Sequence, residues 1–305
     1  MQSAATARTA FLSGLIDYAG LFPPESRDMA RAVEGYRDAR ALQSWMVERF
    51  ICPDTRLEEL AGFLTDEPDP WPLAVVISPR SGDWSKGIAD YARSLAVVEL
   101  AMRDSARFVL AEIRIPPGIV EDPALAAILA SVRISLEALF DTVLFEVSLD
   151  RTDSLSRQVR AIGEAAAGAK IRCGGPTVAD FPTPEQVAAF IAATAAARIP
   201  FKATAGLHHP LRHWDGDPGV KRHGFLNLVG AAVLARALHL DEPELTEVIA
   251  EEDPAAFELT DMVFRWRHRV VTVDEIGDAR ARFMLGYGSC SFTEPIADLV
   301  ELGML

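Results

Sequence analysis

Charged and polar side chains occur two residues apart inside four short apolar runs of the chain. The pairs are Glu112 and Arg114 in RFVLAEIRI (107–115), Glu146 and Ser148 in TVLFEVSL (142–149), Lys170 and Arg172 in AKIRCGG (169–175), and Lys202 and Thr204 in PFKATAGL (200–207). Because side chains alternate between the two faces of a strand, both members of each pair share a face. A buried charge is costly unless an opposite charge answers it, so we expect Lys202 to meet Glu146 or Glu112.

Two lysines on neighbouring strands suit carbonyl chemistry. A nearby positive charge and burial both lower the pKa of an amine, so we expect Lys202 to lower the pKa of Lys170. A neutral amine can attack a carbonyl carbon and form a Schiff base, while Glu146 or Glu112 relays protons. These four residues are therefore the predicted catalytic groups of a lyase of the class I aldolase type. Alternatively, such ion pairs only fill the interior of the protein, although apolar residues often stabilise a core equally well.

Eight apolar runs of strand length alternate with helical patterns. They span residues 14–20, 45–52, 73–78, 107–115, 142–149, 169–175, 200–207 and 223–228, and the eighth is the weakest. Their content of Val, Ile and Phe favours strands, whereas residues 94–102 are interpreted as the end of the third helix. The alternation predicts an α/β fold, a (β/α)8 TIM barrel whose polar inner rim holds the site. A doubly wound open sheet is the alternative, although no G-x-G-x-x-G follows the first run.

The pattern changes after residue 240, where helical segments surround the small-residue loop GYGSCSF (286–292). We therefore predict a single domain in which residues 1–240 form the barrel and residues 241–305 form a C-terminal helical extension packed on it. Earlier in the chain, Thr183, Pro184 and Gln186 have the spacing of a capping box, which predicts that a helix begins there.

KATAGL (202–207) resembles the seventh-strand motif of deoxyribose-phosphate aldolases, a Lys-Ala-Ser/Thr-small-Gly-apolar pattern. The resemblance implies that the Schiff-base lysine lies on the preceding strand, where Lys170 stands. It also implies that Lys202 matches the lysine that tunes the pKa of the Schiff-base lysine. It covers roughly forty residues. The sixth run departs from the family, because KIRCGG replaces a Lys-Thr-Ser-Thr-Gly type of sequence and Arg172 and Cys173 are foreign to it.

Polar groups after the sixth and seventh runs predict an anion-binding rim. Two glycines, Gly174 and Gly175, let backbone N–H groups approach a ligand, and Arg172 can pair with a phosphate or carboxylate. An ordinary turn explains the glycines equally well. The other predicted substrate-binding residues are Thr204, His208, His209, Asp17 and Ser289.

The segment HHPLRHWDGD (208–217) is dense in histidine and aspartate, which are metal ligands. No helix fixes their spacing, so we predict no metal and no other cofactor. One of the two histidines is instead expected at the rim as an acid, base or hydrogen-bond donor. Cys290 could be a nucleophile, but the sequence shows no partner for it.

The chain has 305 residues and a net charge of -14. An acidic surface repels phosphate backbones, so we predict a small anionic substrate and no nucleic-acid partner. We read no signal peptide, no apolar run long enough to span a membrane, and no disulfide pattern, which predicts a cytoplasmic protein. A homo-oligomer stays open. The alternative functions are a non-covalent isomerase, decarboxylase or hydrolase, metal-assisted or not, and a non-catalytic anion-binding barrel.

Overall fold

Eight parallel strands close into a barrel in the order β1, β13, β7, β6, β5, β4, β3, β2. This computed structural model describes residues 5–65, 67–78, 83–149, 152–217 and 219–305. The barrel strands are β1 (Ile16–Tyr18), β2 (Val47–Pro53), β3 (Trp71–Ile77), β4 (Ala106–Arg114), β5 (Thr142–Glu146), β6 (Gly168–Arg172), β7 (Phe201–Thr204) and β13 (Met284–Ser289). The predicted (β/α)8 barrel is confirmed.

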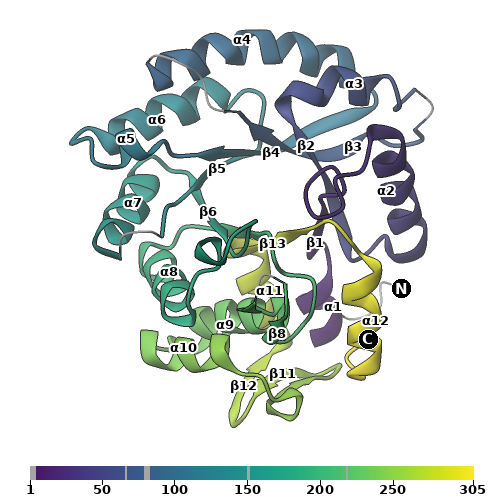
Figure 1. The fold of residues 1–305 in the computed structure, drawn as a ribbon, viewed down its shortest axis with the longest axis vertical. Coiled ribbons are helices and arrows are strands. Elements are labelled where there is room, and N and C mark those ends of the chain that lie inside the picture. Colours follow the sequence, from purple (N-terminus) through teal and green to yellow (C-terminus); the bar gives the residue numbers. More distant parts are fainter. Residues whose placement is uncertain (1–4, 66, 79–82, 150–151, 218) are drawn as a thin grey trace.

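Helices surround the strands (Figure 1). They are α1 (Ala7–Leu12), α2 (Met29–Gln43), α3 (Leu57–Ala61), α4 (Trp84–Met102), α5 (Pro117–Val120), α6 (Leu125–Leu136), α7 (Thr152–Glu164), α8 (Pro184–Ala197), α9 (Phe225–Leu238), α10 (Glu242–Ala250), α11 (Val273–Arg282) and α12 (Thr293–Glu301). The interpretation of residues 94–102 as helix is confirmed, because they lie in α4. The predicted capping box is also present at α8, where the side chains of Thr183 and Gln186 each accept the other's backbone N–H.

The prediction of the eighth strand at residues 223–228 was wrong. Helix α9 begins at Phe225, and every residue from there to Ala235 is buried. A helix buried on all sides has no polar face, so its first turns cannot be told from a buried strand by pattern. The strand that closes the barrel is β13 (Met284–Ser289), which overlaps the predicted loop at 286–292.

Glycines in β13 hid this strand from the sequence, since glycine is depleted in strands. Gly286 has a φ of 132°, and a Cβ there would lie 2.8 Å from the Leu15 carbonyl oxygen. At Gly288 a Cβ would lie 3.0 Å from Ile51 Cδ1 and 3.1 Å from Thr204 Oγ1. Close packing at the closure of the barrel therefore requires the residues that weaken the strand signal.

The segment 241–305 supplies the closing strand as well as helices α10 to α12. It also forms an antiparallel sheet of β10 (Phe257–Leu259), β11 (Val263–Trp266) and β12 (Arg269–Thr272). Arg280 of α11 donates hydrogen bonds to the carbonyl oxygens of Phe11 and Ser13, each 3.0 Å away, and to that of Met284. These bonds tie α11 to the end of α1 and to the start of β13.

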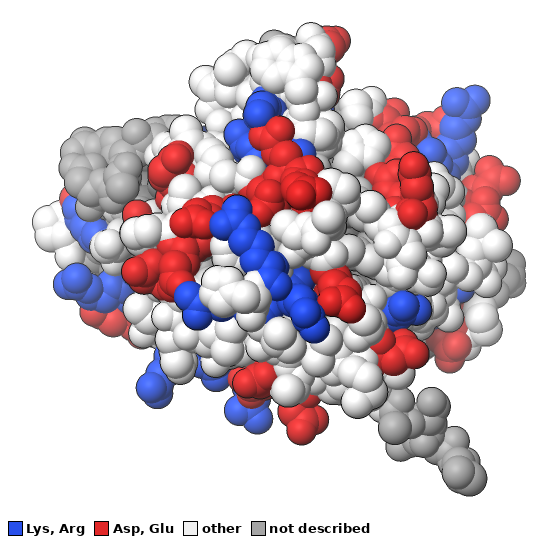
Figure 2. All heavy atoms as spheres, turned by 90° about the horizontal axis from the view of Figure 1, so that it is seen from below, with Lys and Arg blue, Asp and Glu red and all other residues white. Residues whose placement is uncertain are grey.

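The face in Figure 2 carries acidic and basic side chains interspersed with uncharged ones. In the part of the chain that the structure describes, no helix is both long and apolar enough to cross a membrane. Cys52, Cys173 and Cys290 are all buried and free.

Candidate active site

Two lysines and three acidic residues form a continuous chain of ion pairs inside the barrel. Lys202 Nζ lies 2.5 Å from Glu112 Oε1 and also contacts Asp17 Oδ2. Lys170 Nζ lies 2.7 Å from Glu112 Oε2 and 3.1 Å from Glu146 Oε2. All five side chains are buried. The carboxylate of Glu112 therefore bridges both amines. Of the two carboxylates predicted to pair with Lys202, Glu112 is the one that does so.

The register of adjacent strands produces this arrangement. Glu146 of β5 pairs with Lys170 of β6, and Lys170 pairs with Lys202 of β7. On the far side of the closure, Asp17 of β1 pairs with Gly288 of β13, which pairs with Thr204 of β7. Alternation turns these side chains to the inner face, so residues distant in sequence meet within the barrel.

An arginine lies at each end of the ion-pair chain. Asp17 Oδ1 accepts hydrogen bonds from the backbone N–H and the Nη1 of Arg49 in β2, both at 3.1 Å. At the other end, Arg114 Nε lies 3.9 Å from Glu146 Oε1, and the Arg114 side chain is 67% exposed. Sequence reasoning missed Arg49, although a charge inside the apolar run WMVERFIC (45–52) was a visible signal.

The carboxylates control the protonation of Lys170. Burial lowers the pKa of Lys170, but Glu112 and Glu146 outweigh burial and raise it above the ordinary lysine value. Burial raises the pKa of Glu112, but the two lysines outweigh burial and lower it to about 2. The expectation that Lys202 would depress the pKa of Lys170 was therefore wrong, because a carboxylate sits between the two amines.

Lysine is scarce in this chain. Of 30 basic residues only four are lysines, namely Lys86, Lys170, Lys202 and Lys221. Lys86 and Lys221 are exposed at the surface, whereas Lys170 and Lys202 are 5% and 0% exposed. Arginine keeps its proton in proteins, while a buried lysine can lose it and act as a nucleophile. The two buried positions therefore carry amines, which can be deprotonated, where arginine would supply only a fixed charge.

A pocket of about 100 Å³ opens beside the ion-pair chain. Its lining includes the ends of β4, β5 and β6 and the loop that follows β6, with Arg114, Glu146, Ser148, Arg172 and Asp180 among the polar residues. Arg172 Nε donates a hydrogen bond of 2.9 Å to the Gly174 carbonyl oxygen. The pocket lies at the carboxyl ends of the strands, where barrel enzymes bind substrate.

Packing accounts for the two glycines that follow β6. A Cβ on Gly174 would lie 3.1 Å from Gly206 Cα, and a Cβ on Gly175 would lie 2.6 Å from Asp180 Cβ. The loops after β6 and β7 thus touch at Gly174, while Gly175 makes room for Asp180. Thr204 is half-buried, with its Oγ1 against Gly288.

The remaining predicted rim residues contact a different part of the mouth. Nδ1 of His208 lies 3.2 Å from Glu294 Oε2, and its Nε2 lies 3.8 Å from Cys290 Sγ, a partner that the sequence did not reveal. Nδ1 of His209 lies 2.6 Å from Asp298 Oδ2. The Ser289 hydroxyl donates to the Ser291 carbonyl oxygen at 2.5 Å.

The segment 208–217 contains β8 (His213–Asp215), which pairs with β9 (Val220–Arg222) as a hairpin between β7 and α9. Asp215 forms an ion pair with Arg222. His213 Nδ1 lies 2.9 Å from the Leu211 carbonyl oxygen. Within the described residues, no three His, Cys, Asp or Glu side chains are grouped so that they could hold a metal ion.

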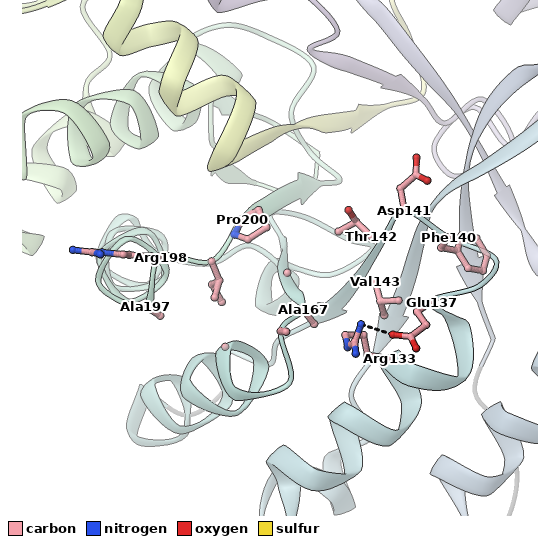
Figure 3. A pocket seen from close by; sticks show the side chains of 14 residues that line it. Arg133, Glu137, Phe140, Asp141, Thr142, Val143, Ala167, Ala197, Arg198 and Pro200 are labelled. Atoms are coloured by element: carbon pink, nitrogen blue, oxygen red, sulfur yellow. Dashed lines mark ion pairs between the residues drawn. The ribbon is translucent and has the colours of Figure 1, made fainter.

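A larger pocket, of about 430 Å³, lies at the opposite end of the barrel. Thr142, Gly168 and Pro200, at or next to the starts of β5, β6 and β7, line it. Figure 3 shows Arg133 and Glu137 of this lining facing each other as an ion pair of 2.8 Å. No residue of the ion-pair chain lines this larger pocket, so the candidate active site is placed at the smaller pocket.

No protein-family model matches the chain, and no curated protein matches it. Among solved structures, "QR15, an Aldolase" aligns with a TM-score of 0.44 and 14% identity, over 63% of this chain and 80% of that one. The "Crystal structure of a putative deoxyribose-phosphate aldolase from Coccidioides immitis" aligns with a TM-score of 0.45 and 13% identity, over 64% of this chain and 74% of that one. Both similarities concern the fold alone.

Proposed function

We propose that this protein is a lyase of the class I aldolase type that acts on a small carbonyl compound carrying an anionic group. In this proposal Lys170 forms the Schiff base, and Lys202 holds Glu112, the carboxylate that both lysines contact. Two of only four lysines lie buried side by side and share the carboxylate of Glu112, and this pairing carries the proposal. Such a cluster is an expensive way to fill a core that apolar residues could fill, which favours a catalytic role.

Access favours Lys170 over Lys202 as the nucleophile. Lys170 contacts Glu146, which lines the pocket at the carboxyl ends of the strands. Lys202 is fully buried and contacts both Asp17 and Glu112. Its positive charge helps to hold Glu112 ionised, which the lowered pKa of Glu112 reflects.

Glu146 is the better proton acceptor for Lys170. Glu112, with a pKa of about 2, is a weak base. Glu146 lies 3.1 Å from the amine and next to the pocket. Transfer of one proton from Lys170 to Glu146 therefore gives the neutral amine that attack on a carbonyl requires.

The reaction then follows from the amine. The Lys170 nitrogen bonds to the carbonyl carbon, the oxygen takes one proton from that nitrogen and one from Glu146 and leaves as water, and an iminium results. The iminium accepts the electron pair released when a neighbouring carbon–carbon bond breaks, and a carboxylate takes the proton that the departing hydroxyl-bearing fragment loses. Protonation of the enamine carbon and hydrolysis of the new iminium release the second fragment and restore Lys170.

Borohydride trapping tests the proposal. The protein is incubated with small aldehydes, ketones and 2-oxo acids, reduced, and mapped by mass spectrometry. We expect one saturable adduct on Lys170 that is absent from Lys170→Met. Exposed Lys86 and Lys221 serve as internal controls for nonspecific reaction. An adduct on Lys202 alone would reverse the two lysine roles, and no adduct above the surface lysines would refute imine chemistry.

The resting protonation of Lys170 also supports a second candidate, non-covalent function. Since the pKa of Lys170 is raised by Glu112 and Glu146, the amine is charged at neutral pH. A fixed ammonium can stabilise an enolate or oxyanion, as in an isomerase or decarboxylase. Such an enzyme would turn over substrate without a trappable adduct, whereas a non-catalytic barrel would bind ligand and turn nothing over.

A further inference from the structure

The pocket beside Glu146 has two arginines whose guanidinium groups are only partly engaged. Arg114 reaches Glu146 only at 3.9 Å. Arg172 uses its Nε on the Gly174 carbonyl oxygen and, among the described residues, has no acidic group within ion-pair distance. A guanidinium has five N–H donors, so both side chains keep donors for a ligand.

Asp180 lines the same pocket as both arginines. Its carboxylate accepts hydrogen bonds from the backbone N–H and hydroxyl of Thr177 at 2.8 Å and 2.7 Å. These bonds lower its pKa, and the charges of Arg172 and Arg114 both add to the effect. The two arginines, from strands β4 and β6, therefore lie beside one pocket that already accommodates a carboxylate.

The charges at the pocket balance. Arg114 and Arg172 contribute two positive charges to the lining, and Glu146 and Asp180 contribute two negative ones. Lys170 and Glu112, which form an ion pair next to Glu146, add one charge of each sign. An anion therefore gains from the free guanidinium donors rather than from an excess of positive charge. Asp180 is already satisfied by Thr177, which leaves the arginine donors open.

The spacing of the charged groups limits the length of the substrate. The single carboxylate of Glu146 separates Arg114 from Lys170. The anionic group and the reacting carbon must therefore be close neighbours in the substrate.

Resting on the proposed function, we propose that the substrate is a short 2-oxo acid whose carboxylate binds Arg114 and Arg172 while its carbonyl carbon meets Lys170. A bidentate guanidinium–carboxylate contact would orient the adjacent carbonyl toward the amine. This places anion recognition on Arg114 as well as on the predicted Arg172, and gives Gly174 and Gly175 a packing role instead.

Pyruvate and acetone differ only in the carboxylate that replaces a methyl group, so they are the matched probes for trapping on Lys170. We expect pyruvate to half-saturate trapping at a concentration at least roughly tenfold below that of acetone, as for one charge-assisted hydrogen bond. Arg172→Gln and Arg114→Gln should each raise the value for pyruvate by roughly tenfold, and by clearly more than they raise the value for acetone. Arg107→Gln, in the same strand as Arg114 but paired with Asp141 at its other end, should change neither.

Dihydroxyacetone phosphate and dihydroxyacetone form the second pair of probes. Preference for the phosphate ester over pyruvate would overturn the inference in favour of a phosphate site. Equal trapping of pyruvate and acetone on Lys170, unaffected by the arginine substitutions, would overturn it while leaving the imine chemistry intact.

Lactate tests the carboxylate site even when no imine forms, since it has a hydroxyl group in place of the carbonyl and cannot condense with an amine. Calorimetric titration of the native protein should show binding of lactate and none of 2-propanol, with lactate binding lost in Arg172→Gln. That result without any lysine adduct would support the carboxylate site and refute the Schiff base. Absence of lactate binding, together with equal trapping of the two ketones, would refute the carboxylate site.

Discussion

Replacement of Lys202 by methionine should lower the free energy of unfolding at pH 7 by about 3–5 kcal/mol, the cost of removing one partner from a buried ion pair. Lys202 is fully buried and contacts the buried carboxylates of Asp17 and Glu112. Methionine fills similar space but leaves Asp17 with Arg49 alone and Glu112 with Lys170 alone.

The pKa of Glu112 gives an independent magnitude. It is about 2 in the folded protein against the ordinary 4.5, and this difference corresponds to about 3 kcal/mol of stability. Because the folded pKa is the lower one, this contribution is fully present above pH 4.5 and is lost as the pH falls through 2. About 2 kcal/mol of it should be gone by pH 3. In Lys202→Met the pKa of Glu112 is less depressed, so the deficit relative to the native protein should shrink as the pH falls from 5 to 3.

Urea denaturation followed by circular dichroism at pH 7, 5 and 3 measures both effects. Lys221→Met is the matched control, because Lys221 pairs with Glu252 at the surface, where both side chains are nearly half exposed. That substitution should cost less than about 1 kcal/mol. Equal losses in the two variants, or a Lys202→Met deficit that does not change with pH, would show that the buried pairs do not contribute as described.

Three further predictions concern other groups. Glu146→Gln should shift the pH profile of Lys170 trapping to lower pH, because Glu146 helps to raise the pKa of Lys170; an unshifted profile between pH 6 and 10 would contradict this. Burial lowers the pKa of His223 from 6.5 to about 4. The unfolding free energy should therefore fall by up to about 3 kcal/mol as the pH is lowered from 6.5 to 4. An NMR titration that gives His223 a pKa near 6.5 would refute this prediction. Gly286→Ala should lower the melting temperature, whereas Gly277→Ala, which meets open space in α11, should not.

The first seven barrel strands could be predicted from the sequence because each combines apolar residues with a length that excludes a long helix. The eighth could not, since β13 needs glycine at 286 and 288 to pack against its neighbours. The strand-like run at 223–228 was misread because α9 is buried on all sides. In both places tertiary packing overrides the local pattern.

The candidate site could also be predicted only in part from the sequence. The spacing of Lys170, Lys202, Glu112 and Glu146 within strands placed them on one inner face, and their register brings them into contact. The sequence could not show that Glu112 would lie between the two amines, and this position reverses the expected pKa shift of Lys170. Distances between side chains on neighbouring strands depend on register and barrel shear, which strand patterns do not contain.

The most direct test of the central claim is the mass of the Lys170 peptide after borohydride reduction in the presence of pyruvate at pH 9. The alkaline pH is needed because Glu112 and Glu146 raise the pKa of Lys170 above its ordinary value. We predict one adduct on Lys170, saturable with pyruvate and absent from Lys170→Met, while Lys86 and Lys221 stay largely unmodified. An unmodified Lys170 peptide, or adducts spread evenly over the four lysines, would contradict the account of Lys170 as a Schiff-base nucleophile.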